Sequence, residues 1–444
     1  MISWQGIAVV PSIDIKESDA RSLDYFRGVV GPAISGKLDS EFWNRLVLQA
    51  GSETPAIRHA TLAISSLYES FGSSPTHANH VAVQHYNRAI RAVMSTSDQH
   101  VALLACVLFV CIEFLMGNSG AATDHCGHGI SILNAMMVNH ASTLREDSLL
   151  DIFCRLSLFP FFFGSTPLTF PILSIIEGQN ILMSHPTSDP RQLQRHLDIL
   201  VCRIIRLIRN GDKYRLGGNL SGEIPGQLLT EQNGLELQLQ HWEGSFHQLK
   251  ESHPSTQDTN WDYDGLEMKF LVARIWARNA FSLDETAYDA HVKDFRRVVH
   301  MGLLLAHSTS SCDPMVQPKF RFEMGLFPLL YFVAIKCRTF DIRMKALNLM
   351  NTLGVSRENL WDRVVMDAVA RRIIELEHGV CLAGASRSGP KLQSSEPLTH
   401  SAVRIMDSIM SNDTVPVAGS SRRVTFFLTS NNGTVNLARE WVSV

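Results

Sequence analysis

The segment TDHCGHG brings two histidines and a cysteine within four residues of one another, and these side chains together can bind zinc. His125 and His128 are one helical turn apart and would share a face of a helix. Cys126 belongs instead to an apolar stripe that continues through Ile130 and Leu133, so its thiol is predicted to face a core. No fourth ligand follows at a usual spacing. We therefore interpret the segment as surface histidines beside a core thiol and assign no metal ligand.

Motifs for nucleophilic or cofactor-dependent chemistry do not occur in the sequence. It contains no GxSxG, HExxH, GxxxxGK(S/T) or CxxC. The one SxxK, from Ser388 to Lys391, reads SGPK, and its Gly-Pro pair cannot hold serine and lysine on a helix. We therefore assign no catalytic or cofactor-binding residue, expect no cofactor, and do not expect an enzyme. A catalytic group in a cleft between helices would carry no such motif, so a helical enzyme stays an alternative.

The segment KCRTFDIRMK holds four cations, which are Lys336, Arg338, Arg343 and Lys345. A cluster of this kind can bind phosphate groups. The residues between the cations favour a joint between two helices instead, because Thr339 can cap a new helix and Asp341 suits its first turn. Lys336 and Arg338 would then follow the preceding helix, where cations complement its dipole. Arg338 and Arg343 are predicted to hold helix ends.

Composition and charge are those of a globular chain with no strong electric field. Of 444 residues, 45% are hydrophobic and 19% are charged, which excludes a disordered protein. The 40 Lys and Arg nearly balance the 43 Asp and Glu, giving a net charge of −3. No overall charge would draw this chain to DNA or to an acidic membrane.

The cysteines are scattered singly and mostly lie among apolar neighbours. They are Cys106, Cys111, Cys126, Cys154, Cys202, Cys312, Cys337 and Cys381. This distribution is typical of free buried thiols in a reducing compartment, where cysteine behaves as a small hydrophobic residue.

The most apolar run is VALLACVLFVCIEFLMG, from Val101 to Gly117. It is slightly short for a membrane span, and Glu113 interrupts it near its end. We interpret it as a fully buried core helix and expect no contact with a membrane.

Helical periodicity dominates the chain and predicts an all-α protein built as a multi-helix array of antiparallel helix pairs. Apolar residues recur at three-four spacing within 57–71, 83–93, 126–137, 193–207, 235–249 and 292–303. Trp43, Trp242 and Trp361 are expected in the core. One strand is predicted at Arg423–Thr429, in a small C-terminal β-hairpin that turns at Asn432-Gly433.

A series of blocks in the same order resembles the fungal-specific transcription factor domain, the regulatory region of fungal binuclear zinc-cluster transcription factors. The blocks are FWNRLVLQAGSETPAIRHATLAISSLYESF, HYNRAIRAVM, VALLACVLFVCIEFLMGNSGAATDHCGHGISIL, LELQLQHWEGSFHQL and RENLWDRVVMDAVARRIIELEHG. In the segment FRFEMGLFPLLYFVAIKCRTFDIRMKALNLM, Cys337 and Arg338 resemble a Cys-Arg pair that precedes the next helix in the family. The likeness extends from Asp24 to Gly379.

The resemblance and the linker composition together predict four parts. These are an N-terminal extension at 1–23, the helical regulatory domain at 24–383, a linker at 384–399 and a C-terminal appendage at 400–444. The linker assignment follows from the composition of GASRSGPKLQSSEPL.

Members of the family usually begin with a six-cysteine zinc cluster, whereas the first cysteine here is Cys106. The resemblance therefore implies a transcription regulator-like protein that lacks this DNA-binding module, so no direct DNA contact is expected from this chain alone. We expect it to act in the nucleus, or in nucleus and cytoplasm, on a metabolic or secondary-metabolite pathway. Its expected partners are proteins, including a homo- or heterodimer partner, or a small-molecule effector. The alternatives are a helical scaffold or binding protein and the helical enzyme considered above.

Overall fold

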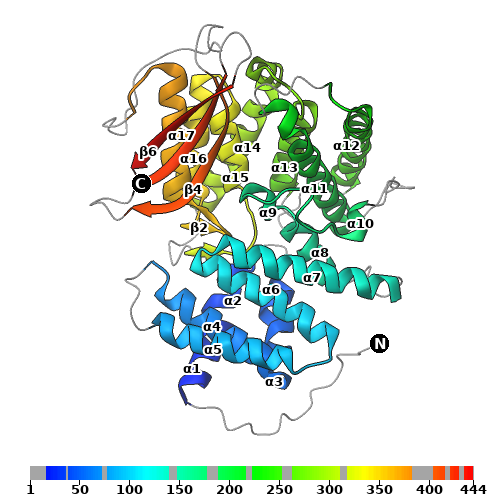
Figure 1. Cartoon of the computed structure of the whole chain (residues 1–444), viewed down its shortest axis with the longest axis vertical. Helices are drawn as coiled ribbons and strands as arrows, with labels where there is room; N and C mark the ends of the chain where they lie inside the picture. Colours follow the sequence, from blue (N-terminus) through cyan, green and yellow to red (C-terminus); the bar gives the residue numbers. More distant parts are fainter. Residues whose placement is uncertain are drawn as a thin grey trace. The chain divides into compact units, whose positions relative to one another are not determined.

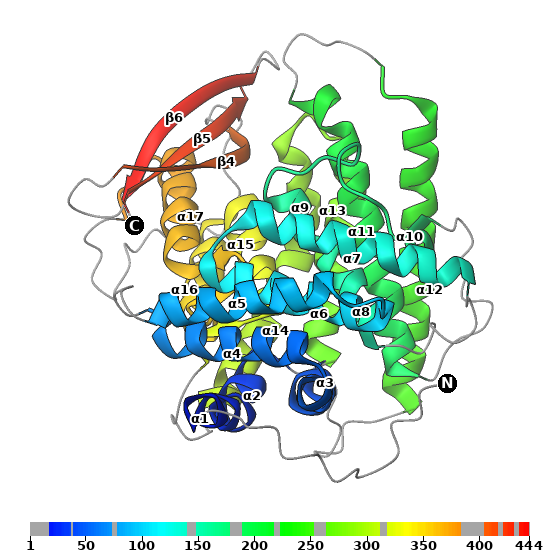
Figure 2. The same cartoon turned by 60° about the horizontal axis from the view of Figure 1, so that its bottom comes forward.

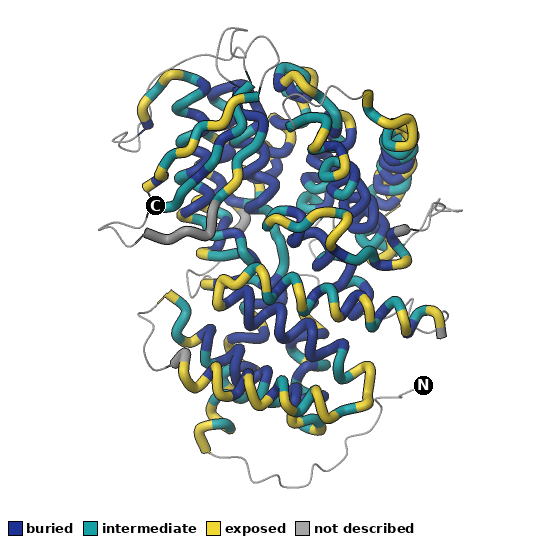
Figure 3. The backbone as a smooth tube through the Cα atoms, in the orientation of Figure 1, coloured by how far each residue is buried: buried dark blue, intermediate teal, exposed yellow. Residues whose placement is uncertain are grey.

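The computed structural model describes residues 17–36, 39–72, 78–139, 148–177, 189–216, 223–252, 263–310, 318–382, 404–415, 421–429 and 435–443. The chain forms two compact units, Met1–Leu149 and Leu150–Val444. Both are built from helices, and the described strands belong to two three-stranded sheets in the second unit (Figure 1). The predicted fold class, mostly α with a small C-terminal β element, is confirmed. Buried residues lie in the interior of each unit (Figure 3).

The first unit contains α1 (Glu17–Tyr25), the π-helical η1 (Phe26–Val30), α2 (Gly31–Ile34), the π-helical η2 (Phe42–Leu46), α3 (Val47–Glu53), α4 (Pro55–Ser70), α5 (Ala78–Met94), α6 (Gln99–Met116) and α7 (Ser119–Asn139). Helix α4 lies at its centre and packs against α5 and α6, while α6 packs against α7. Helix α4 begins with Thr54 at the N-cap and Pro55 in the first turn, a position that suits the fixed φ of proline.

Helix α6 is the apolar core of this unit. The Asp98 side chain caps its start by accepting hydrogen bonds from the amides of His100 and Val101, at 2.8 and 3.4 Å. Gly117 ends it in the left-handed conformation, with φ of 75°, which glycine adopts without strain. By length and composition, α6 is the one described helix that could cross a membrane, but 72% of it is buried inside the structure. This burial is that of a core helix, as the sequence predicted.

The second unit begins within α8 (Ser148–Leu156). Its further elements are α9 (Phe159–Phe162), α10 (Ser174–Glu177), α11 (Pro190–Arg215), α12 (Gly226–Ser252), α13 (Tyr263–Arg278), the 3₁₀-helical η4 (Glu285–His291), α14 (Val292–Ser310), β1 (Phe320–Arg321), α15 (Phe327–Lys336), α16 (Phe340–Leu353), β2 (Arg357–Glu358), β3 (Trp361–Asp362), α17 (Arg363–His378), β4 (Arg404–Val415), β5 (Ser421–Thr429) and β6 (Val435–Ser443).

Neighbouring helices of the second unit pack in pairs around aromatic side chains. Helix α11 packs against α12 and α13, and α15 packs against α16 and α17. The ring of Trp242 is stacked between Phe246 and Phe270, with centroids 5.0 and 4.9 Å away. Its indole nitrogen donates a hydrogen bond of 2.9 Å to the carbonyl oxygen of Leu193 on α11. This hydrogen bond satisfies the polar atom of a fully buried tryptophan.

The cysteines of the described residues are free thiols. Six are buried, as predicted: Cys106, Cys111, Cys126, Cys154, Cys202 and Cys337. Cys381 is exposed, and position 312 lies outside the described residues. Burial raises the pKa of the Cys337 thiol to about 11, so this sulfur is a protonated, weakly reactive group at neutral pH.

The C-terminal residues form an antiparallel sheet in the order β4-β5-β6. The predicted strand Arg423–Thr429 lies within β5, which forms a hairpin with β6. The predicted turn at Asn432-Gly433 falls outside the described residues, as do the linker 384–399 and the first residues of the N-terminal extension. Figure 2 shows the sheet lying against α17. The division of the chain at 23, 383 and 399 stays a prediction.

A second sheet, in the order β1-β2-β3, positions a buried carboxylate at the start of α15. Glu358 of β2 accepts a hydrogen bond of 2.8 Å from the amide of Gly325. A Cβ atom at Gly325 would lie 3.1 Å from both carboxylate oxygens, so a side chain there would crowd the carboxylate. Burial raises the pKa of Glu358 to about 7, although Arg321 on β1 opposes the shift.

The buried tryptophans are expected to contribute strongly to stability. Trp43→Ala and Trp242→Ala should each lower the free energy of unfolding by about 3–5 kcal/mol, because each would leave a large cavity. Trp361, 7% exposed, should behave similarly. Urea denaturation measures the change. The matched control is Trp441→Ala, because Trp441 is 49% exposed and its loss should change stability by less than about 1 kcal/mol. Equal effects at Trp242 and Trp441 would contradict the packing.

Glu358 should make stability depend on pH between its unfolded and folded pKa values. Because its pKa is raised to about 7, the folded state holds the proton more tightly than the unfolded state. Its contribution to stability is therefore complete below about pH 4.5 and is lost as the pH rises through 7. Glu358→Gln should remove this loss and be more stable than the wild type at pH 8, by at most about 3 kcal/mol. At pH 4.5 the two proteins should be similar.

Urea denaturation at pH 4.5, 6 and 8 tests this expectation. The exposed Glu53→Gln serves as the control, and it should leave the difference between pH 4.5 and 8 unchanged. If Glu358→Gln showed the same pH dependence as the wild type, the carboxylate would not be the titrating group.

Candidate functional site: a buried charge network around strand β4

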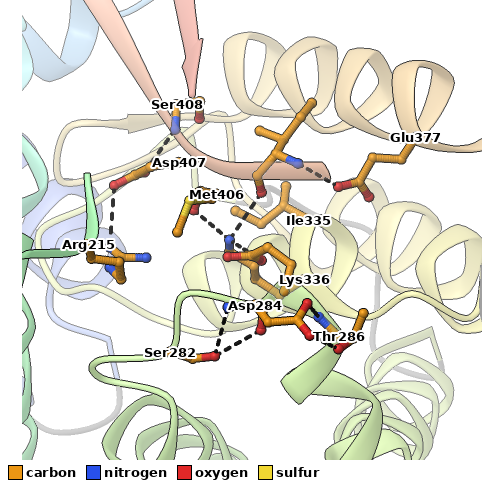
Figure 4. Close-up of polar contacts among 12 residues, drawn as sticks. Arg215, Ser282, Asp284, Thr286, Ile335, Lys336, Glu377, Met406, Asp407 and Ser408 are labelled. Atoms are coloured by element: carbon orange, nitrogen blue, oxygen red, sulfur yellow. Dashed lines mark hydrogen bonds and ion pairs between the residues drawn. The ribbon is translucent and has the colours of Figure 1, made fainter. Parts of the chain in front are cut away.

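The cations of the predicted helix joint lie inside the second unit. Arg343 is 0%, Arg338 3% and Lys336 8% exposed, while Lys345 is exposed on α16. Because three of the four are buried, they cannot present a basic surface to a phosphate backbone. Figure 4 shows the surroundings of Lys336, where labelled residues of α11, η4, α15 and α17 lie around the beginning of β4. We call Arg215, Glu285, Lys336, Arg343 and Glu377, together with Arg404–Asp407 of the strand, the β4 anchor.

Lys336 is the central cation of the β4 anchor. Its Nζ donates to Glu285 Oε2 at 2.7 Å and to the carbonyl oxygens of Met406 at 2.6 Å and Ile405 at 3.3 Å. It also lies 5.3 Å from the centroid of the Tyr288 ring. An ammonium group has three N–H donors, and three acceptors surround this one. These contacts leave no donor for a ligand, so Lys336 holds the strand.

The carboxylate of Glu285 is placed by the local structure of η4. The Asp284 side chain caps this helix by accepting a hydrogen bond of 2.8 Å from the amide of Thr286. This cap directs the side chain of Glu285 inward. Burial raises the pKa of Glu285, and the neighbouring Lys336 opposes the shift. Removing either charge would leave the other buried without its counterpart, which is strongly unfavourable.

Arg343 and Glu377 form the second part of the β4 anchor. Arg343 Nε and Nη2 each donate at 2.8 Å to the carbonyls of Ala334 and Ile335, in the last turn of α15. Its guanidinium lies 2.6 Å from Glu377 Oε2. The other oxygen of Glu377 accepts from the amide of Ile405 at 3.0 Å. The predicted role of Arg343 in holding a helix end is thus confirmed. Thr339 occupies the N-cap position of α16, as predicted, but makes no side-chain capping hydrogen bond.

The end of α11 supplies the third part. Asp407 Oδ2 lies 3.5 Å from Arg209 and 4.0 Å from Arg215, and Arg215 also pairs with Asp212 at 3.0 Å. Burial acts to lower the pKa of Arg215, but the neighbouring carboxylates of Asp212 and Asp407 outweigh it. The pKa is therefore above its ordinary value. Strand β4 is therefore held by charged groups from α11, α15 and α17.

Arg338 and His378 complete the surroundings. Arg338 donates to Asp289 Oδ2 of η4 at 2.7 Å, an ion pair to a neighbouring element that the sequence did not predict. The pKa of His378 is lowered to about 4, mainly by burial and to a smaller extent by the positive charge of Arg343. The imidazole is therefore neutral at neutral pH and adds no further positive charge beside Arg343.

The histidines considered as zinc ligands occupy different environments in the first unit. Cys126 is fully buried and His128 is exposed, both as predicted. The interpretation of His125 as a surface residue is wrong: its Nε2 lies 2.7 Å from the hydroxyl of Tyr86, and burial lowers its pKa. The same hydroxyl donates to Glu113 Oε1 at 2.7 Å. Within the described ranges, no group of three or more His, Cys, Asp or Glu side chains is placed to hold a metal ion.

Comparison with known proteins gives a partial match. A stretch of 146 residues is 29% identical to the aspercryptin biosynthesis cluster-specific transcription regulator atnN of Emericella nidulans. The match covers 29% of this chain and 22% of that protein. The chain thus corresponds to about a fifth of the relative's length. No protein-family model matches the chain, and no solved structure matches it. Over part of its length, the chain is similar to a fungal transcription regulator.

The Lys336–Glu285 pair should stabilise the second unit. Lys336→Met is expected to lower the free energy of unfolding by about 3–5 kcal/mol, because Glu285 and two carbonyls would lose their donor. The double variant Lys336→Met with Glu285→Leu should lose less than the sum of the single variants, since it leaves no unpaired charge. Urea denaturation gives these values, and hydrogen exchange of the β4 amides reports whether the strand is released.

Lys345→Met is the matched control, because Lys345 is an exposed cation of the same segment, 3.5 Å from Asp341. Its loss should change stability by about 0.5 kcal/mol or less. Should Lys336→Met behave like Lys345→Met, the contacts of Lys336 would contribute little to the fold.

Proposed function

We propose that this protein is a fungal transcription regulator-like protein whose helical region acts through protein partners or a small-molecule effector. The observation that carries the proposal is the 29% identity to a cluster-specific transcription regulator over 146 residues. The ordered blocks from Asp24 to Gly379, which resemble the regulatory region of fungal zinc-cluster transcription factors, support the same assignment. A mostly helical fold agrees with it, although a fold alone does not define a function.

In this proposal, the helical region corresponds to the fungal-specific transcription factor domain and acts in the nucleus. The 444 residues contain no CxxC pair, so contact with DNA would be made by another polypeptide segment, with this region supplying regulation. The matched relative is described as specific to a biosynthesis cluster. We propose by analogy that this protein regulates a metabolic or secondary-metabolite pathway.

The β4 anchor has a structural role. Its titratable groups pair with one another and with backbone atoms of β4. An active site needs such groups to face a substrate. The matched relative is also a regulator by description.

A tethering experiment tests the regulatory proposal directly. Residues 1–444 fused to a heterologous DNA-binding module should change transcription of a reporter by several-fold in a fungal host, because a regulatory region acts when it is brought to a promoter. The DNA-binding module alone is the control. Deletion of the gene, followed by transcript profiling, should alter a defined group of transcripts.

The scaffold alternative predicts different results. A folded fusion that leaves the reporter unchanged, together with a deletion that changes no transcript, would contradict the regulatory proposal and favour a scaffold. Circular dichroism of the purified fusion, compared with that of the unfused chain, excludes misfolding as the cause.

A further inference from the structure

Among the described strands, β6 forms the outer edge of the C-terminal sheet. Strand β6 pairs with β5 on one side, and no described strand pairs with its other side. An edge strand presents unpaired backbone N–H and C=O groups along its length, which can bind another extended segment. Proteins usually protect such edges with proline, with charged side chains, most often lysine, or with short length. The nine residues of β6, VNLAREWVS, contain neither proline nor lysine. Its charged residues are Glu440, which accepts hydrogen bonds from Arg372, and Arg439.

The two faces of the sheet are different. Val424 and Phe426 of β5 are fully buried. On the same side, Glu440 of β6, opposite Val424, accepts hydrogen bonds from Arg372 of α17. This face is therefore directed toward the helices. Residues of the opposite alternation point away from α17.

The outward face carries large apolar side chains. Ile409, Leu437 and Trp441 are 55%, 56% and 49% exposed. In the register, Leu437 lies opposite Phe427, and Trp441 lies opposite Arg423. Leu437 and Trp441 both belong to the edge strand, so an added strand would contact both. Leu437 and Trp441, two residues apart from Arg439 on either side, are the exposed large apolar residues of this face that an added strand would cover.

Arg439 places a positive charge on this face of the edge strand. Arg439 is exposed between Leu437 and Trp441, and Arg423 lies beside Trp441 on β5. Among the described residues of the sheet, the acidic residue on this same face is Asp407. Its carboxylate already lies 3.5 Å from Arg209. A ligand that pairs its side chains with those of β6 would therefore gain from a negative charge opposite Arg439.

The pattern of β6 also argues against a second copy of this chain as the ligand. An antiparallel β6–β6 pair that placed Leu437 opposite Trp441 would place Arg439 opposite Arg439. Like charges directly opposite each other are destabilising.

We propose that the edge of β6 binds an extended segment of a partner protein as a fourth strand, and that this segment carries an acidic residue between two apolar residues at alternate positions. The apolar residues lie opposite Leu437 and Trp441, and the acidic residue lies opposite Arg439. Backbone hydrogen bonds supply affinity and these three pairs supply selectivity, as in other cases of strand addition. The inference is independent of the regulatory function proposed above and needs no transcriptional readout.

Peptide binding to the full chain tests the proposal. The probes are two fluorescein-labelled peptides, TTITETITT and TTITKTITT, measured by fluorescence anisotropy. The wild type should bind the glutamate peptide about tenfold more tightly than the lysine peptide, because one pairs with Arg439 and the other is repelled. Arg439→Glu should reverse this preference, and Trp441→Ala should weaken both peptides.

The matched control is Arg296→Glu, since Arg296 is an exposed cation on α14 of the same unit. It should keep the wild-type preference. Two N-methylated forms of the glutamate peptide add a further test, one methylated at odd-numbered and one at even-numbered residues. In an added strand only every second N–H faces β6, so one form should lose binding and the other should keep it. All variants change exposed side chains, and their melting temperatures should match that of the wild type.

Several outcomes would overturn the proposal. These are equal affinity of the wild type for the two peptides, absence of saturable binding, and a preference unchanged by Arg439→Glu. Sedimentation velocity addresses the remaining occupant: a dimer of the full chain that Trp441→Ala dissociates, and that prevents binding of the glutamate peptide, would identify a second copy at this edge. The comparison of the two peptides on the wild type needs no variant, so it stands even if a variant fails to fold.

Discussion

The arrangement of the second unit depends on the burial of one ammonium group. Helix α15 is apolar along its length and ends in Lys336, which is 8% exposed. A buried charge is tolerated only when a counter-charge and hydrogen-bond acceptors replace its water. Glu285 supplies the charge, and the carbonyls of Ile405 and Met406 supply the acceptors. Carbonyl groups of the C-terminal sheet therefore replace water around the Lys336 ammonium. Strand β4 is held against the helices by these charged contacts as well as by apolar packing.

The sequence predicted the helices well because their signals are local. Thr54-Pro55, Asp189-Pro190 and the three-four apolar spacing mark elements within a few residues. The β4 anchor has no such signal: Lys336 and Met406 are 70 residues apart, and only the fold brings them together. The run LFPLLYFVAI before Lys336 indicates burial, but a cation at a helix end is also explained locally by the helix dipole. The burial of His125 likewise has no local signal, because its partner Tyr86 is 39 residues away.

The functional proposals rest on different kinds of observation. The regulatory role rests on a partial sequence similarity, and neither the fold nor the β4 anchor contains chemistry that would replace it. The binding edge of β6 rests on geometry, exposure and charge in a part of the chain beyond the resembling region, which ends at Gly379. The helical region and the C-terminal sheet are thus assigned separate roles, with the β4 anchor as their physical connection.

The distance in sequence between Lys336 and its carbonyl acceptors has a consequence for synthesis on the ribosome. Translation proceeds at roughly 5–20 residues per second, so about 4 to 14 s separate the addition of Lys336 from that of Met406, 70 residues later. During this interval the nascent chain already contains Glu285 but not the two carbonyls. The ammonium must remain hydrated until they arrive. Final closure of the second unit around α15 therefore waits for the C-terminal strands, and a ribosome that stalls within this interval would expose an apolar helix that has not yet obtained its last partners.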